Sequence, residues 1–285
     1  MDERIFSTGW TNYELIDAGG GKKLERFGNV ITIRPELQAY FKSSIPFTEW
    51  EKQVHFTFSE EKSTKGKWKK NKLSDLDIPE KWNIEIEHLT CQLELTNFKH
   101  IGIFPEQVLN WSFISENLKP ADRFLNLFAY SGIASIVARS TGASVTHVDS
   151  IKQLVNWAKT NMELNQLSDI RWIIDDALLF TKKEVKRGNT YDFIIMDPPA
   201  FGFGSKGERW ILEEQLPFLI ENTFKLLNEG GTLIINTYSP KLSLNMLKKE
   251  VNRFFSPKKT SANELWMKTK HGKELFFGNL IRCVK

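Results

Sequence analysis

The chain has 285 residues, 41% of them hydrophobic and 26% charged, and a formal net charge of +4 at neutral pH. This composition is typical of a globular protein long enough for one large domain and a smaller one. No run approaches the roughly 18 consecutive apolar residues of a membrane helix, and the first ten residues lack the pattern of a signal peptide. We therefore expect a cytoplasmic protein, whose mild basicity permits a polyanionic partner without indicating one.

The two cysteines, Cys91 and Cys283, both lie in segments that read as strands. They form no CxxC pair, and no histidine is spaced to share a metal ion with either of them. The sequence therefore predicts reduced, buried thiols and no metal site.

The N-terminal third is predicted to be β-rich. Short strand-like segments occupy residues 13–19, 20–28 and 29–36, and the glycines at 19–21 can supply the positive φ angles of a tight connection. Two more strands are predicted at 54–58 and 88–95. Residues 1–97 are thus expected to form a small β-rich accessory domain. A helix is then predicted to open at 104–107, with Pro105 in its first turn and Glu106 near the positive end of its dipole.

A lysine-rich run, EKSTKGKWKKNK at residues 61–72, places six lysines around Trp68. One interpretation is an exposed loop that its charge keeps solvated, and the other is a surface that contacts phosphates. The sequence gives the two about equal weight.

From residue 122 onward, apolar runs of about five residues alternate with amphipathic stretches, which is typical of a parallel sheet covered by helices on both faces. Strands are predicted at 124–128, 144–148, 170–174, 192–196 and 232–236. Two β-like segments, 264–268 and 274–283, are expected to close the sheet edge as an antiparallel hairpin. Residues 98–285 are therefore predicted to form an α/β domain with a Rossmann-like, mostly parallel sheet.

The clearest helix is predicted at residues 151–165, with Ser150 as its N-cap. Its expected apolar stripe comprises Ile151, Leu154, Val155, Ala158 and Met162.

Ligands of open α/β sheets bind beyond the carboxyl ends of the strands, so the loops there are the candidates for a site. The first predicted strand leads into the turn Phe128-Ala129-Tyr130-Ser131-Gly132, which has a single glycine. A dinucleotide fold would show GxGxxG here, because a pyrophosphate requires close backbone approach at several positions. The turn argues against NAD or FAD and suits a ligand without phosphate, whose amino-acid end is held by backbone groups.

Carboxylates follow the next two strands. Asp149, with Ser150 beside it, can accept hydrogen bonds from ribose hydroxyls, or it can serve as a negative charge at the start of the next helix. The third strand runs into Asp175-Asp176-Ala177, where Asp176 is the favoured acceptor for an adenine amino group and helix capping is the alternative.

The fourth strand ends in Asp197-Pro198-Pro199-Ala200-Phe201. Two prolines have fixed φ and make a rigid, extended rim beside the predicted ligand site. Asp197, which we assign to both the catalytic and the cofactor site, can accept from an amino group of a base, and Phe201 can stack on a base rotated out of its helix. The alternative for Asp197-Pro198-Pro199 is a strand terminator, and the alternative for Phe201 is a core aromatic. The following residues, 202–207, are either a substrate-gating loop or merely a long connection before a helix near residue 208.

The order of glycine turn, acidic strand end, Asp-Ala and Pro-Pro motif resembles that of the class I S-adenosylmethionine-dependent methyltransferases, over residues 120–240. NLFAYSG with DPPAF is similar, more closely, to the large-subunit ribosomal RNA methyltransferase I/K family, whose members modify cytosine C5 or guanine N7. The resemblance implies S-adenosyl-L-methionine as cofactor and RNA as substrate. The segment FKHIGIFPEQ, residues 98–107, resembles the lead-in that helps close the cofactor pocket in that family, which implies cofactor contacts for Lys99, Phe104 and Gln107.

In the residues that bear on the acceptor atom, this chain differs from the members of that family that modify cytosine C5. Cytosine C5 becomes nucleophilic only after a thiolate adds to the ring. Relatives that modify C5 carry a Ser-Cys-Ser-like turn after the fifth strand, where this chain has Thr237-Tyr238-Ser239-Pro240. A base nitrogen is therefore favoured as acceptor over C5.

The leading hypothesis is a methyltransferase acting on an RNA base, with the N-terminal domain and its lysines gripping phosphates. The alternatives are a methyltransferase for a protein or small molecule, and a non-catalytic RNA-binding protein that retains the fold. Against the last stands the joint presence of Gly132, Asp149, Asp176 and Asp197.

Overall fold

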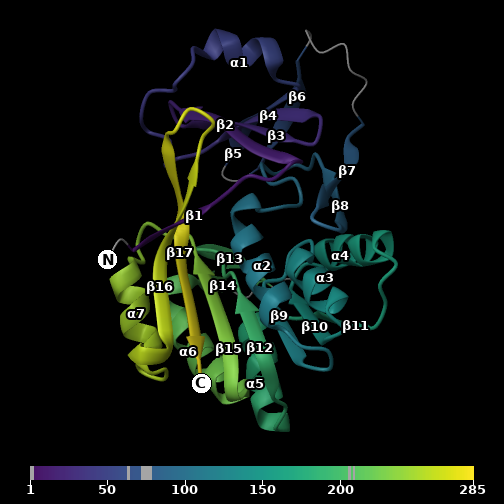
Figure 1. Ribbon diagram of the computed structural model, residues 1–285, viewed down its shortest axis with the longest axis vertical. Helices are drawn as coiled ribbons and strands as arrows, with labels where there is room; N and C mark the ends of the chain where they lie inside the picture. The colour runs from purple at the N-terminus through teal and green to yellow at the C-terminus, as the bar shows by residue number, and fades with distance from the viewer. Residues whose placement is uncertain (1–2, 63–64, 72–78, 205–206, 208) are drawn as a thin grey trace. The chain divides into compact units, whose positions relative to one another are not determined.

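The structure is a computed structural model that describes residues 3–62, 65–71, 79–204, 207 and 209–285 (Figure 1). The chain divides into two compact units, each assembled from separate segments. The C-terminal unit comprises Met1–Ile5, Leu109–Leu265 and Phe277–Lys285, and the N-terminal unit comprises Phe6–Val108 and Trp266–Phe276. Residues 98–108 thus belong to the N-terminal unit. The assignment of 1–97 as an accessory domain and 98–285 as a methyltransferase domain stays a prediction.

One large sheet is the centre of the C-terminal unit. Within the described residues its strand order is β1-β16-β17-β15-β12-β9-β10-β11. The strands from β9 to β12 and β15 are parallel, and β17 joins β15 in antiparallel register, which confirms the predicted mostly parallel sheet with an antiparallel C-terminal hairpin. The bounds are β1 (Arg4–Ser7), β9 (Arg123–Leu127), β10 (Ser144–Asp149), β11 (Ile170–Ile174), β12 (Tyr191–Met196), β15 (Leu227–Thr237), β16 (Thr260–Lys268) and β17 (Glu274–Val284).

Two strand details differ from the predictions. The hairpin of β16 and β17 is not the edge of the sheet, because β1 lies outside β16 and the carbonyl of Glu3 accepts from the Glu264 N–H at 2.7 Å. β15 begins earlier than expected, at Leu227. Its Gly230-Gly231 pair stays within the strand although Gly230 has a positive φ of 78°, and both glycines form backbone hydrogen bonds with Lys285.

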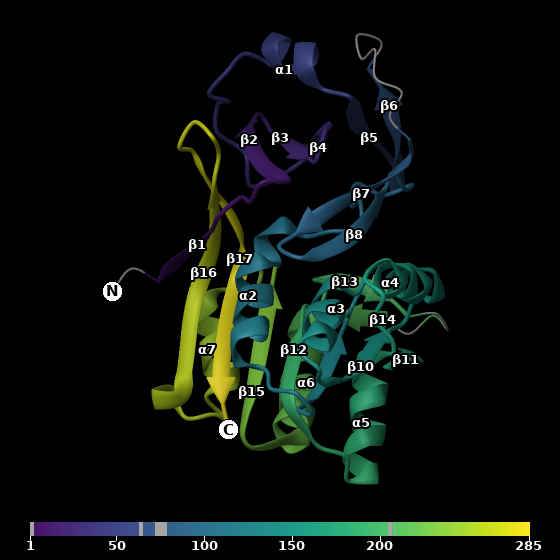
Figure 2. The ribbon, with the colours of Figure 1, turned by 45° about the vertical axis from the view of Figure 1, so that its right-hand side comes forward.

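Helices cover both faces of this sheet. Arg282 of β17 donates to the carbonyl of Leu109 at 2.8 Å, whereas the next residue, Cys283, belongs to a core shared with α5, α6 and α7. Because neighbouring residues of a strand point to opposite faces, α2 lies on the face opposite to α6 and α7 (Figure 2). The helices are α2 (Val108–Asn117), α3 (Ile133–Ser140), α4 (Lys152–Leu164), α5 (Ala177–Arg187), α6 (Leu212–Leu226) and α7 (Leu244–Val251).

The start of α4 corrects the predicted cap. Ile151 occupies the N-cap position without a side-chain cap, and Asp149 Oδ1, not Ser150, accepts the Ile151 N–H at 2.9 Å. The stripe is also shifted: Val155 and Ala158 are buried as predicted, but Asn161 is the third buried residue of the helix. Ile151 is 43% exposed.

The N-terminal unit confirms the predicted β-rich character. Its main sheet has the order β2-β3-β4-β5-β6 within the described residues, and a separate hairpin pairs β7 with β8. Helix α1 places Trp50 in the core of this sheet, with its Nε1 donating to the buried Asp17 at 3.2 Å. The bounds are β2 (Tyr13–Gly19), β3 (Lys22–Phe27), β4 (Val30–Pro35), α1 (Phe47–Gln53), β5 (Phe56–Lys62), β6 (Lys65–Lys70), β7 (Lys81–Ile86), β8 (Leu89–Glu94) and a 3-10 turn, η1 (Pro105–Gln107), which opens α2 as predicted.

The described part of the lysine-rich run lies mostly in strands, since residues 61–62 end β5 and residues 65–70 form β6. β6 is the last strand of its sheet, and Lys65, Lys67, Lys69 and Lys70 are exposed along it. Residues 63–64 and 72 of the run lie outside the described residues. Lysines on an edge strand discourage pairing with a second chain, so this placement has a structural reason independent of any ligand.

No described helix is long and apolar enough to cross a membrane. Likewise, the described residues contain no group of three or more His, Cys, Asp or Glu side chains that could hold a metal ion. Both cysteines are buried and unpaired, and burial raises the pKa of each thiol.

Candidate active site

The turn after β9 has an unusual backbone. Phe128 and Tyr130 adopt positive φ angles of 54° and 52°, and Gly132 follows at 83°. Positive φ is sparsely populated by residues with a side chain and persists only where surrounding contacts impose it. Two such contacts are the hydrogen bonds from the Ala129 N–H to the carbonyl of Val148, at 3.1 Å, and from the Tyr130 N–H to Asp149 Oδ2, at 2.9 Å. The turn is therefore fixed to the end of β10.

Gly132 is required by space as well as by φ. A Cβ at this position would lie 2.6 Å from the Cβ of Ala158, so the start of α3 approaches α4 more closely than a side chain allows. Asn161 of α4 secures the same turn, because its Nδ2 donates to the carbonyl of Ser131 at 2.9 Å. Asn161 was not predicted from the sequence. The signal that could have found it is a polar residue within the apolar face of an amphipathic helix.

Asp149 lies at the end of β10 and is 8% exposed. Its Oδ2 accepts from Tyr130 N–H and its Oδ1 from Ile151 N–H, each at 2.9 Å. Burial raises the pKa of this carboxyl, and the two backbone hydrogen bonds oppose the rise. A carboxylate offers about four acceptor positions, so about two remain for a ligand. Asp149 therefore both shapes the turn, and with it the start of α4, and retains the capacity to bind two hydroxyls.

The acidic pair after β11 is divided between two tasks. The Asp175 N–H donates to the carbonyl of Asp149 at 3.3 Å, and its carboxylate pairs with Lys183. Asp176 caps α5, since its Oδ1 accepts from the Leu179 N–H at 2.8 Å. Helix capping, the alternative considered for Asp176, is therefore present, and a contact with adenine stays a prediction. Ala177 is the first residue of α5 and is buried, and Ser150 is partly exposed beside Asp149.

Asp197 follows the last residue of β12 and is partly buried. Asn236 Nδ2 donates to its Oδ1 at 3.3 Å. Burial raises the pKa of Asp197 to about 6, and the hydrogen bond from Asn236 opposes that rise. Asn236, on β15, is a second residue that the sequence reading missed, because only the pairing of β12 with β15 brings it beside Asp197.

The rim after Asp197 is held in place by one tryptophan. Pro198 is buried, Pro199 is exposed, and Trp210 Nε1 donates to the carbonyl of Pro199 at 2.6 Å. Phe201 is 54% exposed, so the interpretation of this residue as a core aromatic is wrong.

The expected loop at 202–207 is partly structured. Phe201–Phe203 forms β13, which pairs with β14 (Arg209–Ile211), and α6 begins at Leu212, later than the predicted start near 208. Residues 205, 206 and 208 lie outside the described residues.

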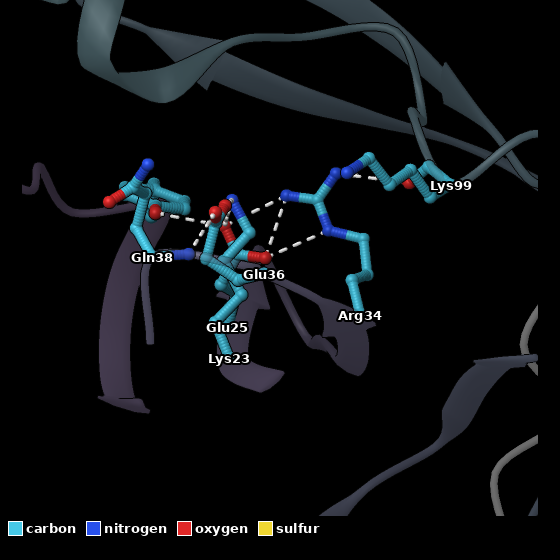
Figure 3. Close-up of polar contacts among 7 residues, drawn as sticks. Lys23, Glu25, Arg34, Glu36, Gln38 and Lys99 are labelled. Atoms are coloured by element: carbon cyan, nitrogen blue, oxygen red, sulfur yellow. Dashed lines mark hydrogen bonds and ion pairs between the residues drawn. The ribbon is translucent and has the colours of Figure 1, made fainter. Parts of the chain in front are cut away.

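Lys99, Phe104 and Gln107 belong to the N-terminal unit. Figure 3 shows the Arg34 guanidinium between Glu25 and the backbone of Lys99. Arg34 Nη1 donates to the carbonyl of Lys99 at 3.1 Å, while Nε and Nη2 donate to Glu25 at 2.8 Å. The predicted lead-in segment is thus tied to a buried ion pair.

The Lys99 side chain is partly buried, and burial lowers the pKa of its amine. The ring of Phe104 lies 5.0 Å from that of His100, and Gln107 is buried in η1. Contacts of these three residues with the cofactor stay a prediction.

At the carboxyl edge of the C-terminal sheet, backbone and carboxylate groups from the ends of β9, β10, β11 and β12 therefore come together as the sequence predicted. This is the arrangement of the class I methyltransferase fold. The family model of S-adenosylmethionine-dependent methyltransferases matches residues 67–261. The chain belongs to this family, and its cofactor is S-adenosylmethionine.

Solved structures agree with this assignment. The SAM-dependent methyltransferase from Agrobacterium tumefaciens is 32% identical, with a TM-score of 0.90 over 98% of this chain and 92% of that chain. The methyltransferase SMU.776, complexed with SAH, shares the fold at 19% identity, with a TM-score of 0.74 over 95% of this chain and 75% of that chain.

The curated relatives are longer proteins. The ribosomal RNA large subunit methyltransferase K/L of Hahella chejuensis is 39% identical over 156 residues, which are 53% of this chain and 21% of that protein. The enzyme of the same name from Cellvibrio japonicus is 29% identical over 214 residues, 73% of this chain and 28% of that protein. The chain thus spans less than a third of the length of these relatives.

Proposed function

We propose that this protein methylates a base of RNA, most specifically ribosomal RNA, at a nitrogen atom, and that it does so in the cytoplasm. The observation that carries the proposal is the partly buried Asp197 carboxylate, followed by two prolines and an exposed phenylalanine. A carboxylate in this position can accept from the amino group of a base while an aromatic ring stacks on its face. The names of the curated relatives support ribosomal RNA as the substrate.

The cofactor site in this proposal lies at the ends of β9, β10 and β11. Bound S-adenosylmethionine supplies an electrophilic methyl group on a sulfonium. The remaining acceptor positions of Asp149 would bind the ribose hydroxyls, and the backbone of the β9 turn would hold the amino-acid end. Ile151 and Leu179, whose backbone N–H groups donate to Asp149 and Asp176, have exposed apolar side chains that suit the faces of an adenine ring. The residues proposed for this site are Phe128, Ala129, Tyr130, Ser131, Gly132, Asp149, Ser150, Asp175, Asp176 and Ala177. Asp197 is assigned here to the substrate, and cofactor contacts of Lys99, Phe104 and Gln107, in the N-terminal unit, stay a prediction.

The chain's own contribution to catalysis is mainly positioning. Methyl transfer is an in-line displacement, so fixing the acceptor atom and excluding water can supply most of the acceleration. Pro198 and Pro199 would hold the rim rigid, Phe201 would fix the plane of the base, and Asp197 would orient its amino group or accept its proton. Accepting the proton requires the ionised form of Asp197, which also has both oxygens as acceptors.

The positions of the two cysteines support a nitrogen rather than a carbon atom as the methyl acceptor. Cys283 pairs with Leu233 in the sheet, four residues before Thr237 at the end of β15. At about 3.3 Å per residue, this places its thiol roughly 13 Å back from the carboxyl edge. Cys91 is buried in β8 of the N-terminal unit. With both thiols buried and their pKa raised, neither suits the attack on cytosine C6 that C5 methylation requires.

We extend the proposal to the exposed lysines of β6, which would contact phosphates of the RNA. Lys67 pairs with Glu61 at 2.9 Å, but both groups are exposed, and such pairs are weak enough to exchange for a phosphate.

The test is methyl transfer from tritiated S-adenosylmethionine by the full chain to total RNA, to protein and to small metabolites. We expect label in RNA, and nucleoside mass spectrometry should find the methyl group on a nitrogen. Asp197→Ala should abolish transfer and leave cofactor affinity, measured by calorimetry, largely intact. Label in protein or metabolites alone would overturn RNA as the substrate, and 5-methylcytidine would overturn the nitrogen acceptor. A loss of cofactor affinity would move Asp197 from the substrate to the cofactor.

A further inference from the structure

The hairpin of β13 and β14 has one anchored face. Trp210, opposite Gly202 in the register, is 4% exposed. Its Nε1 donates to the carbonyl of Pro199 at 2.6 Å, and its ring centroid lies 4.8 Å from that of Phe128. The hairpin is therefore fixed both to the Pro-Pro rim and to the turn after β9.

The other face of the hairpin displays two aromatic rings. Phe201 and Phe203 are 54% and 63% exposed. Because side chains alternate along a strand, both lie on the same, outward face of the hairpin, where polar residues could have stood instead. Their ring centroids are 5.1 Å apart and their planes are 87° from parallel. Adjacent exposed aromatics that are held by each other and by an anchored backbone are typical of a binding surface, whereas single exposed ones need no explanation.

The angle between the rings limits what they can bind. Two perpendicular rings cannot stack on the same flat base, so Phe201 and Phe203 offer faces to two different planar groups. Phe201 is the ring nearer in sequence to Asp197, and under the proposed function it takes the base that is methylated. The face of Phe203 then remains for a second base.

A cation lies beside the two rings. Arg209 is directly opposite Phe203 in the register, and its guanidinium carbon lies 5.9 Å from the centre of the Phe201 ring. Arg209 forms no ion pair with any described residue. Its charge and fork of donors complement a phosphate, and guanidinium groups also stack on bases.

We propose that Phe203 and Arg209 bind the nucleotide next to the methylated base in single-stranded RNA: the neighbouring base stacks on Phe203, and Arg209 contacts the phosphate. The inference rests on the proposed function, because it takes RNA as the substrate. It also implies that the substrate presents at least two unstacked nucleotides, as in a loop or a strand end.

The test measures binding of a fluorescein-labelled twelve-nucleotide oligoadenylate to the full chain by anisotropy, and the KM for total RNA in the tritium assay. Phe203→Leu should weaken oligonucleotide binding about fivefold or more and raise KM with little change in kcat, whereas Phe203→Trp should retain binding. Arg209→Gln should reduce the slope of log affinity against log salt by about one. Phe218→Leu is the matched control, because Phe218 is a 57% exposed phenylalanine on α6 of the same unit.

The outcomes separate the two proposals. If the wild-type chain methylates RNA but Phe203→Leu binds and reacts like wild type, the binding of a neighbouring nucleotide by Phe203 and Arg209 is overturned. The proposed function then stands. An equal loss in Phe218→Leu would also overturn the binding of a neighbouring nucleotide, since the effect would then be general to exposed rings. If the wild-type chain labels no RNA, the proposed function fails, and the proposed binding of a neighbouring nucleotide fails with it. Calorimetric binding of S-adenosylmethionine by each variant confirms that the fold is intact.

Discussion

The side-chain amide of Asn236 donates a 3.3 Å hydrogen bond to Oδ1 of Asp197 across the junction of β15 and β12. A donor at this position favours the ionised carboxylate, while burial favours the protonated one. The balance leaves the pKa of Asp197 at about 6, within reach of neutral pH.

Methyl transfer should therefore rise with pH through about 6, because only ionised Asp197 can take a proton from the substrate and has both oxygens as acceptors. Asn236→Leu removes the donor and should move this midpoint to higher pH. A hydrogen bond to a charged group contributes about 1.5–3 kcal/mol, so a shift of about one pH unit or more is expected. The measurement is kcat/KM for RNA across pH 5–9.

Asn228→Leu provides the control for that shift. Asn228 donates to Asp192 at 2.6 Å on the same two strands, but at their opposite ends. This variant loses an equivalent hydrogen bond without changing the surroundings of Asp197, so its midpoint should stay at that of wild type. A midpoint that moves equally in both variants, or in neither, would contradict the assignment.

Gly132→Ala should destabilise the protein more than Gly188→Ala. Both glycines have positive φ, at 83° and 69°, and each substitution should cost about 1–2 kcal/mol for that reason. Only at Gly132 would the added Cβ also meet another residue, at 2.6 Å from Ala158. We expect Gly132→Ala to exceed Gly188→Ala by about 1–3 kcal/mol in urea unfolding and to weaken S-adenosylmethionine binding. Equal losses would show that the close approach to α4 is relieved at no cost.

The parallel sheet was predictable from the sequence for a physical reason. Strands buried on both faces are continuous apolar runs, and the residues at their carboxyl ends meet at one edge. Asp149 and Asp197 follow such runs directly, so both could be placed before the structure was known. The short strands β1 and β7 lack a comparable run, and the lysines of β6 conceal its alternation.

Residues defined by long-range packing could not be predicted in the same way. Asn236 becomes informative only when β15 lies beside β12, and Trp210 only when its indole reaches the carbonyl of Pro199. Ser150 was predicted to cap α4 from its residue type, but Asp149, one position earlier, has the carboxylate that reaches the Ile151 N–H. In each case several residues compete for one backbone group, and the three-dimensional arrangement selects among them.

The buried pair of Glu25 and Arg34 should be important for the stability of the N-terminal unit. Glu25 is fully buried, and Arg34 donates two hydrogen bonds to it and a third to the carbonyl of Lys99 (Figure 3). Glu25→Ala leaves the guanidinium buried without its carboxylate, which should cost about 3–5 kcal/mol. Urea unfolding followed by tryptophan fluorescence measures the loss.

The control for Glu25 is Glu49→Ala. Glu49 pairs with Lys52 at 2.7 Å, but their side chains are 49% and 66% exposed. Surface pairs contribute about 0–1 kcal/mol, so this variant should unfold nearly as wild type does. Comparable losses in the two variants would show that burial does not distinguish the two pairs.

Asp176 can be tested for two separate tasks, because serine caps a helix about as well as aspartate but has no carboxylate. Asp176→Ser should keep the cap of α5 and the stability of the protein, while Asp176→Ala should lose about 1 kcal/mol. If Asp176 also binds the adenine amino group, both variants should bind S-adenosylmethionine about tenfold more weakly in calorimetry. Ser243→Ala removes the corresponding cap of α7, where Ser243 accepts from the Met246 N–H at 3.3 Å, and should lower stability without changing cofactor affinity. Wild-type affinity in Asp176→Ser would restrict Asp176 to capping, and the adenine amino group would then have to be bound by another group.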